Sequence, residues 1–426
     1  MKNAVSRRAS LRLLGASAPA LWLTREGVAR AQAARLPQAP AVPDERFWRA
    51  LREQFVMPPD LAVMNAANLC PSSLPVLDSL EAATRALDRD PSPACRQEMH
   101  DAKEVTRGIL AEFLRVTPEE IVITRNTSES NNLVSSGLNL KAGDEVLVVS
   151  DNHPSNDVAW KEKAKRFGYT VTALPVVSPH PGAEHYLDAF RKALTPRTRV
   201  LAFSHVTNTV GDVFPARELC RLAREHGVLT LVDGAQSFGL LDLDLREMDP
   251  DFFSGSAHKW PCGPKEAGVL FINRKAESRI WPCIYSAYPG AAGASKTFEA
   301  FGQRDEPAIR AFGEALQLQM RVGRPAIEAR ARELGQRLIA ELARIDGVTV
   351  WTHRDPSRSH AVVSFRPGGL DPGRLLAALY EKDRIVAAAR TGADRGGLRL
   401  SPHFYNSHAE IERAVAAVKR HLATGV

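Results

Sequence analysis

The chain has 426 residues, 44% of them hydrophobic, and a formal net charge of +7 at pH 7. This length is sufficient for two subdomains, and the ordinary apolar content excludes a chain that is mostly disordered. The positive charge does not indicate a nucleic-acid-binding protein. Residues 1–33 hold six basic residues and one acidic residue, which leaves about +2 for the remainder, and no basic stripe interleaved with aromatic residues follows.

The first 33 residues have the pattern of an export signal. The twin arginine Arg7 and Arg8 is followed by an apolar stretch at residues 13–23 and by small residues suited to cleavage near Ala33. This resembles a twin-arginine (Tat) signal peptide, although Ser10 stands where an aromatic residue is usual; an amphipathic N-terminal helix is the alternative. The apolar stretch is shorter than the about 20 residues of a membrane span. We expect export to the periplasm by the Tat machinery and no stable membrane span.

The cysteines do not predict a metal site. Five occur in the chain, and none is spaced as the CxxC pairs typical of zinc ligands. The Tat route exports proteins that are already folded, so a disulfide framework is not required. We interpret the cysteines mainly as small buried apolar residues.

Residues 34–65 are predicted to form a linker and a first helix. The stretch 34–43 is rich in alanine and proline, and Asp44 is placed to cap a helix over residues 45–55. Between residues 66 and 306, short apolar strands then alternate with helical stretches, one of which begins near Thr127. The predicted strands lie at residues 121–125, 144–150, 169–177, 199–206, 228–233, 251–256 and 268–274. This series predicts an α/β large domain with a mostly parallel sheet.

The pattern changes at residue 307. Two helical stretches are expected at residues 308–323 and 329–345, and a last helix at residues 408–422. Short strands are expected at residues 348–353, 361–367, 385–389 and 398–402. The sequence therefore predicts a smaller C-terminal α+β domain over residues 307–426.

Reactive side chains follow two of the predicted strands. Asp233 and Gln236 end the segment GVLTLVDGAQSFG, and His258 and Lys259 follow in FSGSAHKWPCGPKEAGVLFI. Open α/β folds bind ligands at the carboxyl edge of their parallel strands. A lysine in apolar surroundings can lose its proton and attack a carbonyl carbon, and an acid facing a ring nitrogen is the partner that pyridoxal phosphate (PLP) needs.

Four ordered motifs give the chain a family resemblance. The segments TRNTSESNN, DNHPSNDVAW, DGAQS followed by SGSAHKWPCGP, and LRLSPHFYNS are together similar to the class V aminotransferase family. This is the fold-type I PLP branch that includes cysteine desulfurases and isopenicillin-N-epimerase-like enzymes. The resemblance implies a large domain with a mostly parallel seven-stranded sheet, a small C-terminal domain, PLP as cofactor and a homodimer with active sites at the subunit boundary.

The resemblance also assigns roles around the cofactor ring. Lys259 would bind the cofactor covalently and then move protons at the substrate Cα. Asp233 would pair with the pyridine nitrogen, although a helix N-cap after a strand is a common alternative. His153 would stack on the ring opposite the lysine. Gln236 and Asn208 would contact the phenolic oxygen, and Asn208 is also placed to touch the substrate carboxylate.

A phosphate site is implied where the predicted strand 121–125 gives way to a helix. Thr127 and Ser128 begin this helix, whose N–H groups and dipole attract an anion, and helix capping can hold at the same time. Ser256 and His258 would complete the phosphate cup. A partner-subunit threonine of the family also reaches the phosphate, but this chain has Gln303 after Gly302 in the matching stretch.

The small domain is expected to supply the substrate clamp. Arg399, in LRLSP, matches the arginine that binds the substrate α-carboxylate in the family, a task that suits the fork of a guanidinium. A surface arginine on a strand is the alternative. Asn68, in NAANLCPSS, is a further candidate for the substrate pocket.

One difference from the cysteine desulfurases of the family narrows the set of possible reactions. Cysteine desulfurases use a nucleophilic cysteine shortly before the carboxylate arginine, whereas no cysteine follows Cys283 here. The segments AHKW followed by CGPKEAGVLF, and GQRD, resemble the isopenicillin-N-epimerase-like branch more closely, a branch that includes epimerases, lyases and transaminases. We therefore predict an exported PLP enzyme acting at the Cα of an amino acid or amino-acid-containing metabolite, such as a peptide siderophore precursor. An aminotransferase-like reaction needs only the lysine; epimerase and β-lyase reactions stay open. A non-catalytic PLP-fold binding protein is the competing class.

Overall fold

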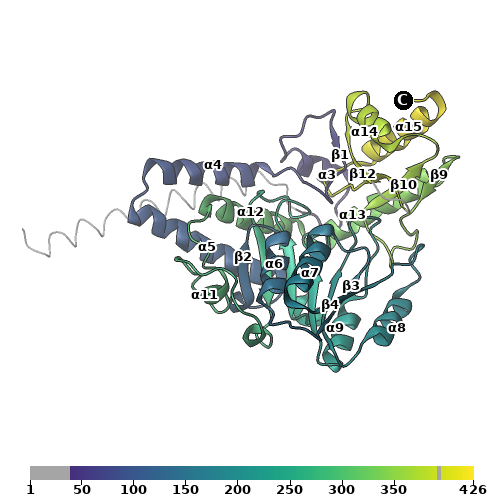
Figure 1. Cartoon of the computed structure of the whole chain (residues 1–426). Coiled ribbons are helices and arrows are strands. Elements are labelled where there is room, and N and C mark those ends of the chain that lie inside the picture. Colours follow the sequence, from purple (N-terminus) through teal and green to yellow (C-terminus); the bar gives the residue numbers. More distant parts are fainter. Residues whose placement is uncertain (1–38, 391–394) are drawn as a thin grey trace, which may run out of the picture.

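The computed structural model describes residues 39–390 and 395–426 (Figure 1). The predicted Tat signal lies outside the described residues. A large sheet with helices on both faces forms the centre of the molecule, and a smaller α+β unit ends the chain. In the described part of the chain, no helix is long and apolar enough to cross a membrane.

The central sheet has seven strands in the order β2-β8-β7-β6-β5-β3-β4. Four neighbouring pairs, from β7 to β4, are parallel, and β8 is antiparallel to both β7 and β2. The mostly parallel seven-stranded sheet is thus confirmed. The strands are β2 (Ile121–Thr124), β3 (Glu145–Val149), β4 (Thr170–Leu174), β5 (Thr198–Ser204), β6 (Leu229–Asp233), β7 (Phe252–Ser256) and β8 (Gly268–Ile272).

Successive residues of the inner strands enter different cores because strand side chains alternate between the two faces. Val148 and Leu231 join the core under α6 (Thr127–Gly137) and α7 (Pro154–Phe167). Leu147 and Val232 join the core on the other face. The helices that cover this second face are α5 (Pro93–Leu114), α8 (Ala183–Ala193), α9 (Ala216–Glu225) and α12 (Glu306–Val322). Burial on both faces explains why these strands have continuous apolar sequences.

Two long helices precede the sheet and were not among the predicted elements. They are α4 (Leu74–Arg89) and α5, and Figure 1 shows them extending side by side away from the sheet. α12 packs against both of them. The predicted helix over 308–323 corresponds to α12, which contributes Ile309 and Phe312 to the core of the large sheet. The boundary proposed at residue 306 stays a prediction.

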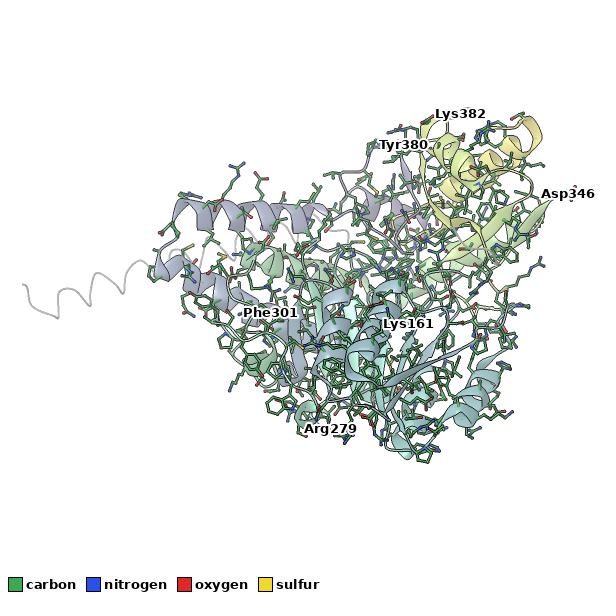
Figure 2. All side chains as sticks on the ribbon, viewed as in Figure 1. Lys161, Arg279, Phe301, Asp346, Tyr380 and Lys382 are labelled. Atoms are coloured by element: carbon green, nitrogen blue, oxygen red, sulfur yellow. The ribbon has the colours of Figure 1, made fainter. Side chains whose placement is uncertain are left out.

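The C-terminal unit contains a second sheet in the order β12-β13-β10-β9, antiparallel throughout. Its strands are β9 (Val348–Val350), β10 (Val363–Pro367), β12 (Ala388–Arg390) and β13 (Gly397–Leu400), and its helices are α13 (Arg324–Leu342), α14 (Pro372–Glu381) and α15 (His408–Thr424). Apolar residues between this sheet and its helices form a core of their own. Long polar side chains such as Lys382, after α14, extend outward (Figure 2).

One predicted strand is divided in the structure. The stretch 385–389 forms β11 (Ile385–Val386), which pairs with β1 (Ala62–Val63), and then β12, which pairs with β13. The expectation of a single strand was wrong because the chain passes from one small sheet to another at Ala387. Short elements complete the chain: α10 (Leu245–Met248), α11 (Ser295–Phe298) and the 3₁₀ turns Pro118–Glu120 and Glu277–Arg279.

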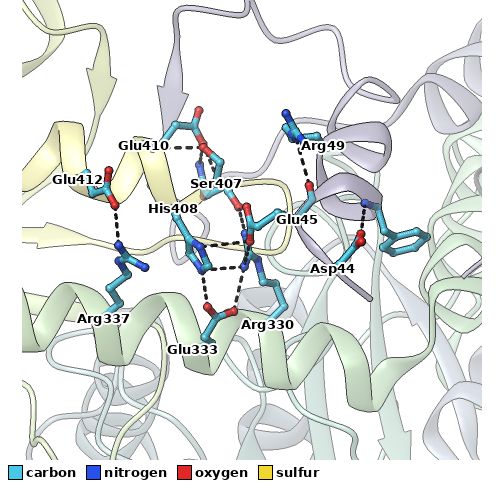
Figure 3. A network of polar contacts seen from close by, with 12 residues as sticks. Asp44, Glu45, Arg49, Arg330, Glu333, Arg337, Ser407, His408, Glu410 and Glu412 are labelled. Atoms are coloured by element: carbon cyan, nitrogen blue, oxygen red, sulfur yellow. Dashed lines mark hydrogen bonds and ion pairs between the residues drawn. The ribbon is translucent and has the colours of Figure 1, made fainter. Parts of the chain in front are cut away.

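The first helix, α3 (Glu45–Arg52), is held against the C-terminal unit. Its predicted cap is confirmed, since the Asp44 carboxylate accepts a hydrogen bond from the Phe47 amide. Arg330 of α13 forms ion pairs with Glu45 and Glu333, and Glu333 also pairs with His408 at the start of α15 (Figure 3). This network connects the N-terminal and C-terminal parts of the described chain.

Candidate active site

The predicted site residues follow strands whose carboxyl ends share one edge of the large sheet. β3, β5, β6 and β7 run in one direction, and β2 runs the same way because both it and β7 are antiparallel to β8. Loops after β3, β5 and β7 carry His153, Asn208 and Lys259, whereas Thr127 begins α6 after β2 and Asp233 is the last residue of β6. This is the edge at which open α/β sheets bind ligands.

A cavity of about 480 Å³ opens at this edge, between the large sheet and β12 and β13. Ten of the twelve predicted site residues line it. They are Asn68, Thr127, Ser128, His153, Asn208, Asp233, Ser256, His258, Lys259 and Arg399. The volume is within the range of small-molecule sites. The structure therefore brings together residues that lie far apart in the sequence.

Lys259 lines the cavity from the start of the loop after β7. Desolvation lowers its pKa from the ordinary 10.5 to about 8; Asp233 opposes this shift, and the positive charge of Arg399 adds to it. A sizeable fraction of the amine is therefore neutral near physiological pH, which is the form that attacks an aldehyde or removes a proton. Burial and the Lys259 charge also lower the pKa of His258, to about 4, so that imidazole is neutral.

The residue after Lys259 fixes the loop. The Trp260 carbonyl accepts hydrogen bonds from Gln319 Nε2 and from His403 Nε2, both at 2.7 Å. The Trp260 indole N–H donates to Gln236 Oε1 at 2.8 Å. Gln319 lies on α12 and His403 follows β13. The backbone directly after Lys259 is therefore fixed by hydrogen bonds from a helix of the large-sheet core and from the C-terminal unit.

Asp233 is buried and oriented by two donors. Its Oδ2 accepts a hydrogen bond from Asn131 Nδ2 at 2.9 Å, and its Oδ1 accepts one from the Ala235 amide at 3.0 Å. Asn131 is in turn fixed by Ser254, whose hydroxyl donates to Asn131 Oδ1 at 2.7 Å. The next residue must be glycine, because a Cβ at Gly234 would lie 2.0 Å from the Phe253 ring. The carboxylate is thus held in one orientation at the floor of the cavity.

We expect an Asn131→Ala substitution to weaken cofactor binding. It removes one hydrogen bond from a buried carboxylate, a loss of about 1–3 kcal/mol, or about 5- to 150-fold in Kd. The Kd is measured by titrating the apoprotein with PLP and following its absorbance. Asn132→Ala, on the exposed side of the same helix, is the control and should leave the Kd unchanged. An unaltered Kd in Asn131→Ala would contradict the orienting role.

The first turn of α6 and the end of β7 form a polar cradle. The Thr127 amide and hydroxyl both lie 2.8 Å from Ser256 Oγ. Asn126, rather than a residue inside the helix, is the N-cap, and it accepts from the Glu129 amide. Ser128 follows in the first turn, where N–H groups lack partners within the helix. An anion at this point is favoured by these donors and by the helix dipole.

His153 is the N-cap of α7 and lines the cavity. Its Nδ1 lies 2.7 Å from Ser155 Oγ and accepts from the Ser155 amide at 3.2 Å. In the neutral ring the proton is therefore on Nε2. Desolvation, with the nearby Lys259 charge, lowers the His153 pKa, so the ring is neutral at pH 7. A neutral planar ring fits the predicted stacking role.

Arg399 enters the cavity from β13. Its guanidinium donates to the Asn208 carbonyl at 2.8 Å and to Asn65 Oδ1 at 3.1 Å, which leaves Nε buried with no hydrogen-bond partner among the described residues. Burial and the charge of Arg390 lower its pKa to about 10, so it stays a cation at neutral pH. No carboxylate neutralises this arginine among the described residues, as expected of a group that binds an anionic ligand.

The other two predicted residues lie outside the cavity lining. Gln236 is buried and binds the Ala67 carbonyl at 3.0 Å as well as the Trp260 indole. Gln303 lies 3.3 Å from Arg96 in a separate surface pocket beside α5. The contact predicted for Gln303 is with the cofactor phosphate of a partner subunit. Its position outside the cavity of its own subunit does not conflict with that prediction. The roles of all twelve residues stay predictions.

Sequence reasoning missed three residues that shape the site: Asn131, Asn65 and Arg390. The signal for Asn131 was a polar residue on the buried face of a predicted helix, which requires a partner. Asn65 gave no such signal, because its link to Arg399 is purely tertiary. Arg390 ends β12 and lines the cavity beside Ala388 and Ala389.

The residues present fit PLP. The cradle at Thr127 and Ser256 suits the phosphate, the oriented Asp233 carboxylate suits the pyridine N–H, and the Lys259 amine suits the aldehyde. Among the described residues, no cluster of histidine, cysteine and acidic side chains suited to a metal ion occurs. The donor set therefore matches an anionic, aldehyde-bearing ring cofactor.

We expect capture of PLP by the apoprotein to depend on the Lys259 pKa. Only the neutral amine attacks the aldehyde, so the rate should rise with pH and level off above about pH 8, instead of rising toward 10.5. Stopped-flow absorbance over a pH series measures this rate. Nα-acetyl-lysine with free PLP is the control for titration of the cofactor itself. A rate that still rises above pH 10 would contradict the lowered pKa.

Comparison with known proteins agrees with this geometry. The family model described as Aminotransferase class-V matches residues 82–414. The isopenicillin N epimerase of Amycolatopsis lactamdurans is 31% identical over 390 residues, covering 87% of this chain and 98% of that protein. A probable cysteine desulfurase of Methanothermobacter thermautotrophicus is 26% identical over 386 residues, covering 83% and 92%.

A solved structure shows the same architecture with the cofactor present. The K223A mutant of C-DES, with glycine covalently linked to PLP, superposes with a TM-score of 0.80 at 27% identity, covering 89% of this chain and 99% of that one. PLP is therefore the cofactor of this fold, and the cavity holds the residues that fit it. The chain belongs to the class V aminotransferase family of PLP-dependent enzymes.

Proposed function

We propose that this enzyme acts at the Cα of an amino acid or an amino-acid-containing metabolite in an aminotransferase-like reaction. One observation carries the proposal: a lysine with a pKa of about 8 shares a cavity with an oriented carboxylate and a guanidinium that lacks an acidic partner among the described residues. Bound PLP supplies an electron sink for charge that develops on Cα. Arg399 binds the substrate carboxylate, and Lys259 takes and returns the proton.

The cavity favours proton transfer over sulfur transfer. None of the described residues that line it is a cysteine, and the sequence contains none after Cys283. Transamination requires a single base that delivers the proton to a second atom on the same face, and Lys259 meets this requirement alone. β-Elimination can also use this base and is separated from transamination by its products.

Epimerisation is the second candidate, and His153 favours it. Inversion requires an acid on the face opposite the base, and the proton on His153 Nε2 is available because Nδ1 is occupied by Ser155. The similarity to an isopenicillin N epimerase points in the same direction. His153→Phe keeps a ring for stacking and removes the proton; it should abolish epimerisation while leaving transamination largely intact.

The deciding experiment is incubation of the holoenzyme with L- and D-amino acids and with acidic peptides in D₂O. A keto product supports transamination, an inverted and deuterated amino acid supports epimerisation, and a released β-group supports elimination. NMR and chiral chromatography report all three. No exchange at Cα with any substrate would favour the non-catalytic binding protein.

We also propose that the chain is exported and works as a homodimer. Export rests on the twin arginine at residues 7–8 and would suit a periplasmic substrate such as a peptide siderophore precursor. An Arg7→Lys, Arg8→Lys double variant that still reaches the periplasm would contradict it. The dimer rests on the family resemblance and on Gln303, and light scattering of the purified protein tests it.

A further inference from the structure

We propose that Arg390 forms a second anion-binding position in the cavity, so that the substrate is an amino acid carrying a second carboxylate beyond the one bound by Arg399. This inference deepens the proposed function and rests on it for the identification of the site. The guanidinium of Arg390 is a cation that forms no ion pair with the described residues around it.

The strand register places the two arginines on the same face. β12 and β13 are antiparallel, with Ala388 opposite Arg399 and Arg390 opposite Gly397. Residues two apart on a strand share a face, so Arg390 and Arg399 are diagonal neighbours, about 7–8 Å apart. Both line the cavity, and Gly397 has no side chain with which to pair Arg390. One elongated molecule can therefore contact both guanidinium groups.

The charge of Arg390 has no dedicated partner among residues 39–390 and 395–426. No hydrogen bond or ion pair to its guanidinium occurs there, and burial lowers its pKa while Asp151 acts on it only at a distance. Asp151 is already occupied by Arg395 at 3.2 Å and by the Thr209 hydroxyl. A partly buried guanidinium with no acid beside it is costly unless a ligand supplies the anion.

The remaining charges of the cavity point to a ligand with two anionic groups. Among the described residues, Lys259, Arg390 and Arg399 are the lysine and arginine side chains that line it, and Asp233, already bound by Asn131, is the carboxylate. The polar cradle that suits the cofactor phosphate is built from other residues, at Thr127 and Ser256. An amino acid with a neutral side chain would satisfy Arg399 and leave Arg390 desolvated. A dicarboxylic amino acid, or a peptide presenting one, satisfies both.

The test measures dead-end ligands on the holoenzyme, so that no turnover is required. Butyrate is glutarate with one of its two carboxylates replaced by hydrogen, so the two ligands differ by one carboxylate. We expect glutarate to bind about 10-fold or more tightly than butyrate, measured by calorimetry and by the cofactor absorbance. Arg390→Gln should bring the two Kd values within about 2-fold of each other by weakening glutarate alone. Arg399→Gln should weaken both ligands.

Two further variants complete the design. Arg366→Gln, which removes an exposed arginine of the same small sheet, should preserve the glutarate preference. Arg390→Lys keeps the positive charge but lacks the guanidinium fork, so it should retain part of the glutarate preference. This result would show that Arg390→Gln acts through loss of charge and not through misfolding. Equal binding of glutarate and butyrate by the wild type, or a preference that survives in Arg390→Gln, would overturn the inference.

Failure of this inference is distinguishable from failure of the proposed function. Turnover of glutamate and aspartate is compared with that of glutamine and asparagine. If acids and amides are turned over equally and glutarate is not preferred over butyrate, the second anion-binding position is refuted, whereas the proposed reaction is not. If the glutarate preference depends on Arg390 but no amino acid is converted, the second anion-binding position is supported and the proposed reaction is refuted.

Discussion

Replacing Lys259 with alanine is expected to lower the turnover of amine substrates by at least about 1,000-fold. The substitution removes the amine that attacks the cofactor aldehyde and the base that moves the Cα proton. No other cavity side chain replaces it, because His258 and His153 have lowered pKa values and different positions in the site. Initial rates with the best substrate of the D₂O panel measure the effect.

The matched control is Lys265→Ala, which removes an exposed lysine six positions further along the same loop region. It should retain wild-type rates and the absorbance of bound cofactor. Added methylamine should restore part of the activity of Lys259→Ala, because a small amine can occupy the vacated space. If Lys259→Ala kept full turnover, the enzymatic interpretation of this cavity would fail.

Replacing Glu299 with alanine is expected to lower the free energy of unfolding by about 3–5 kcal/mol. Glu299 is 1% exposed and forms a bidentate ion pair with Arg107, at 2.8 and 3.0 Å. It also accepts a hydrogen bond from the Ile123 amide at 2.7 Å and lies 3.6 Å from Lys103. Its removal takes the Glu299 carboxylate from the buried Lys103 and from the Ile123 N–H, and leaves Arg107 with only Glu104 and the Ile121 carbonyl as acceptors. Chemical denaturation measures the loss.

An exposed pair provides the control for Glu299. Glu81→Ala breaks an ion pair with Arg85 on the surface of α4, where both side chains are more than half exposed, and should cost less than about 1 kcal/mol. A Glu299→Ala protein as stable as Glu81→Ala would show that water compensates the buried cations. Glu299→Gln keeps the shape and should fall between the two.

The fold could be predicted where one physical rule dominates. Strands buried on both faces are mostly apolar along their length, and β3, β5 and β6 were located by that rule. α4 was missed because its buried face is built largely from small residues such as Ser79 and Ala83, which give a weak apolar pattern. The division of residues 385–389 depends on pairing with β1, far away in the sequence.

The site residues, like the elements of the fold, could be predicted only in part from the sequence. Lys259 and Asp233 end strands, and their chemistry is apparent from residue type and position. Asn65 and Asn131 act only through a neighbour that the fold supplies, at 3.1 Å from Arg399 and 2.9 Å from Asp233. Arg390 directly follows the predicted strand 385–389, yet its importance follows from the lack of a partner among the described residues, which only three-dimensional structure can show.

The anchoring of Trp260 has a consequence for how the enzyme matures in the cell. Its carbonyl is held by Gln319 and His403, and His403 lies near the end of the chain. A ribosome makes Lys259 well before either anchor, so a nascent chain exposes the lysine without the geometry that tunes it. We therefore expect productive capture of PLP to follow the synthesis and docking of β13 and of the loop that carries His403, which would make it a late step in maturation.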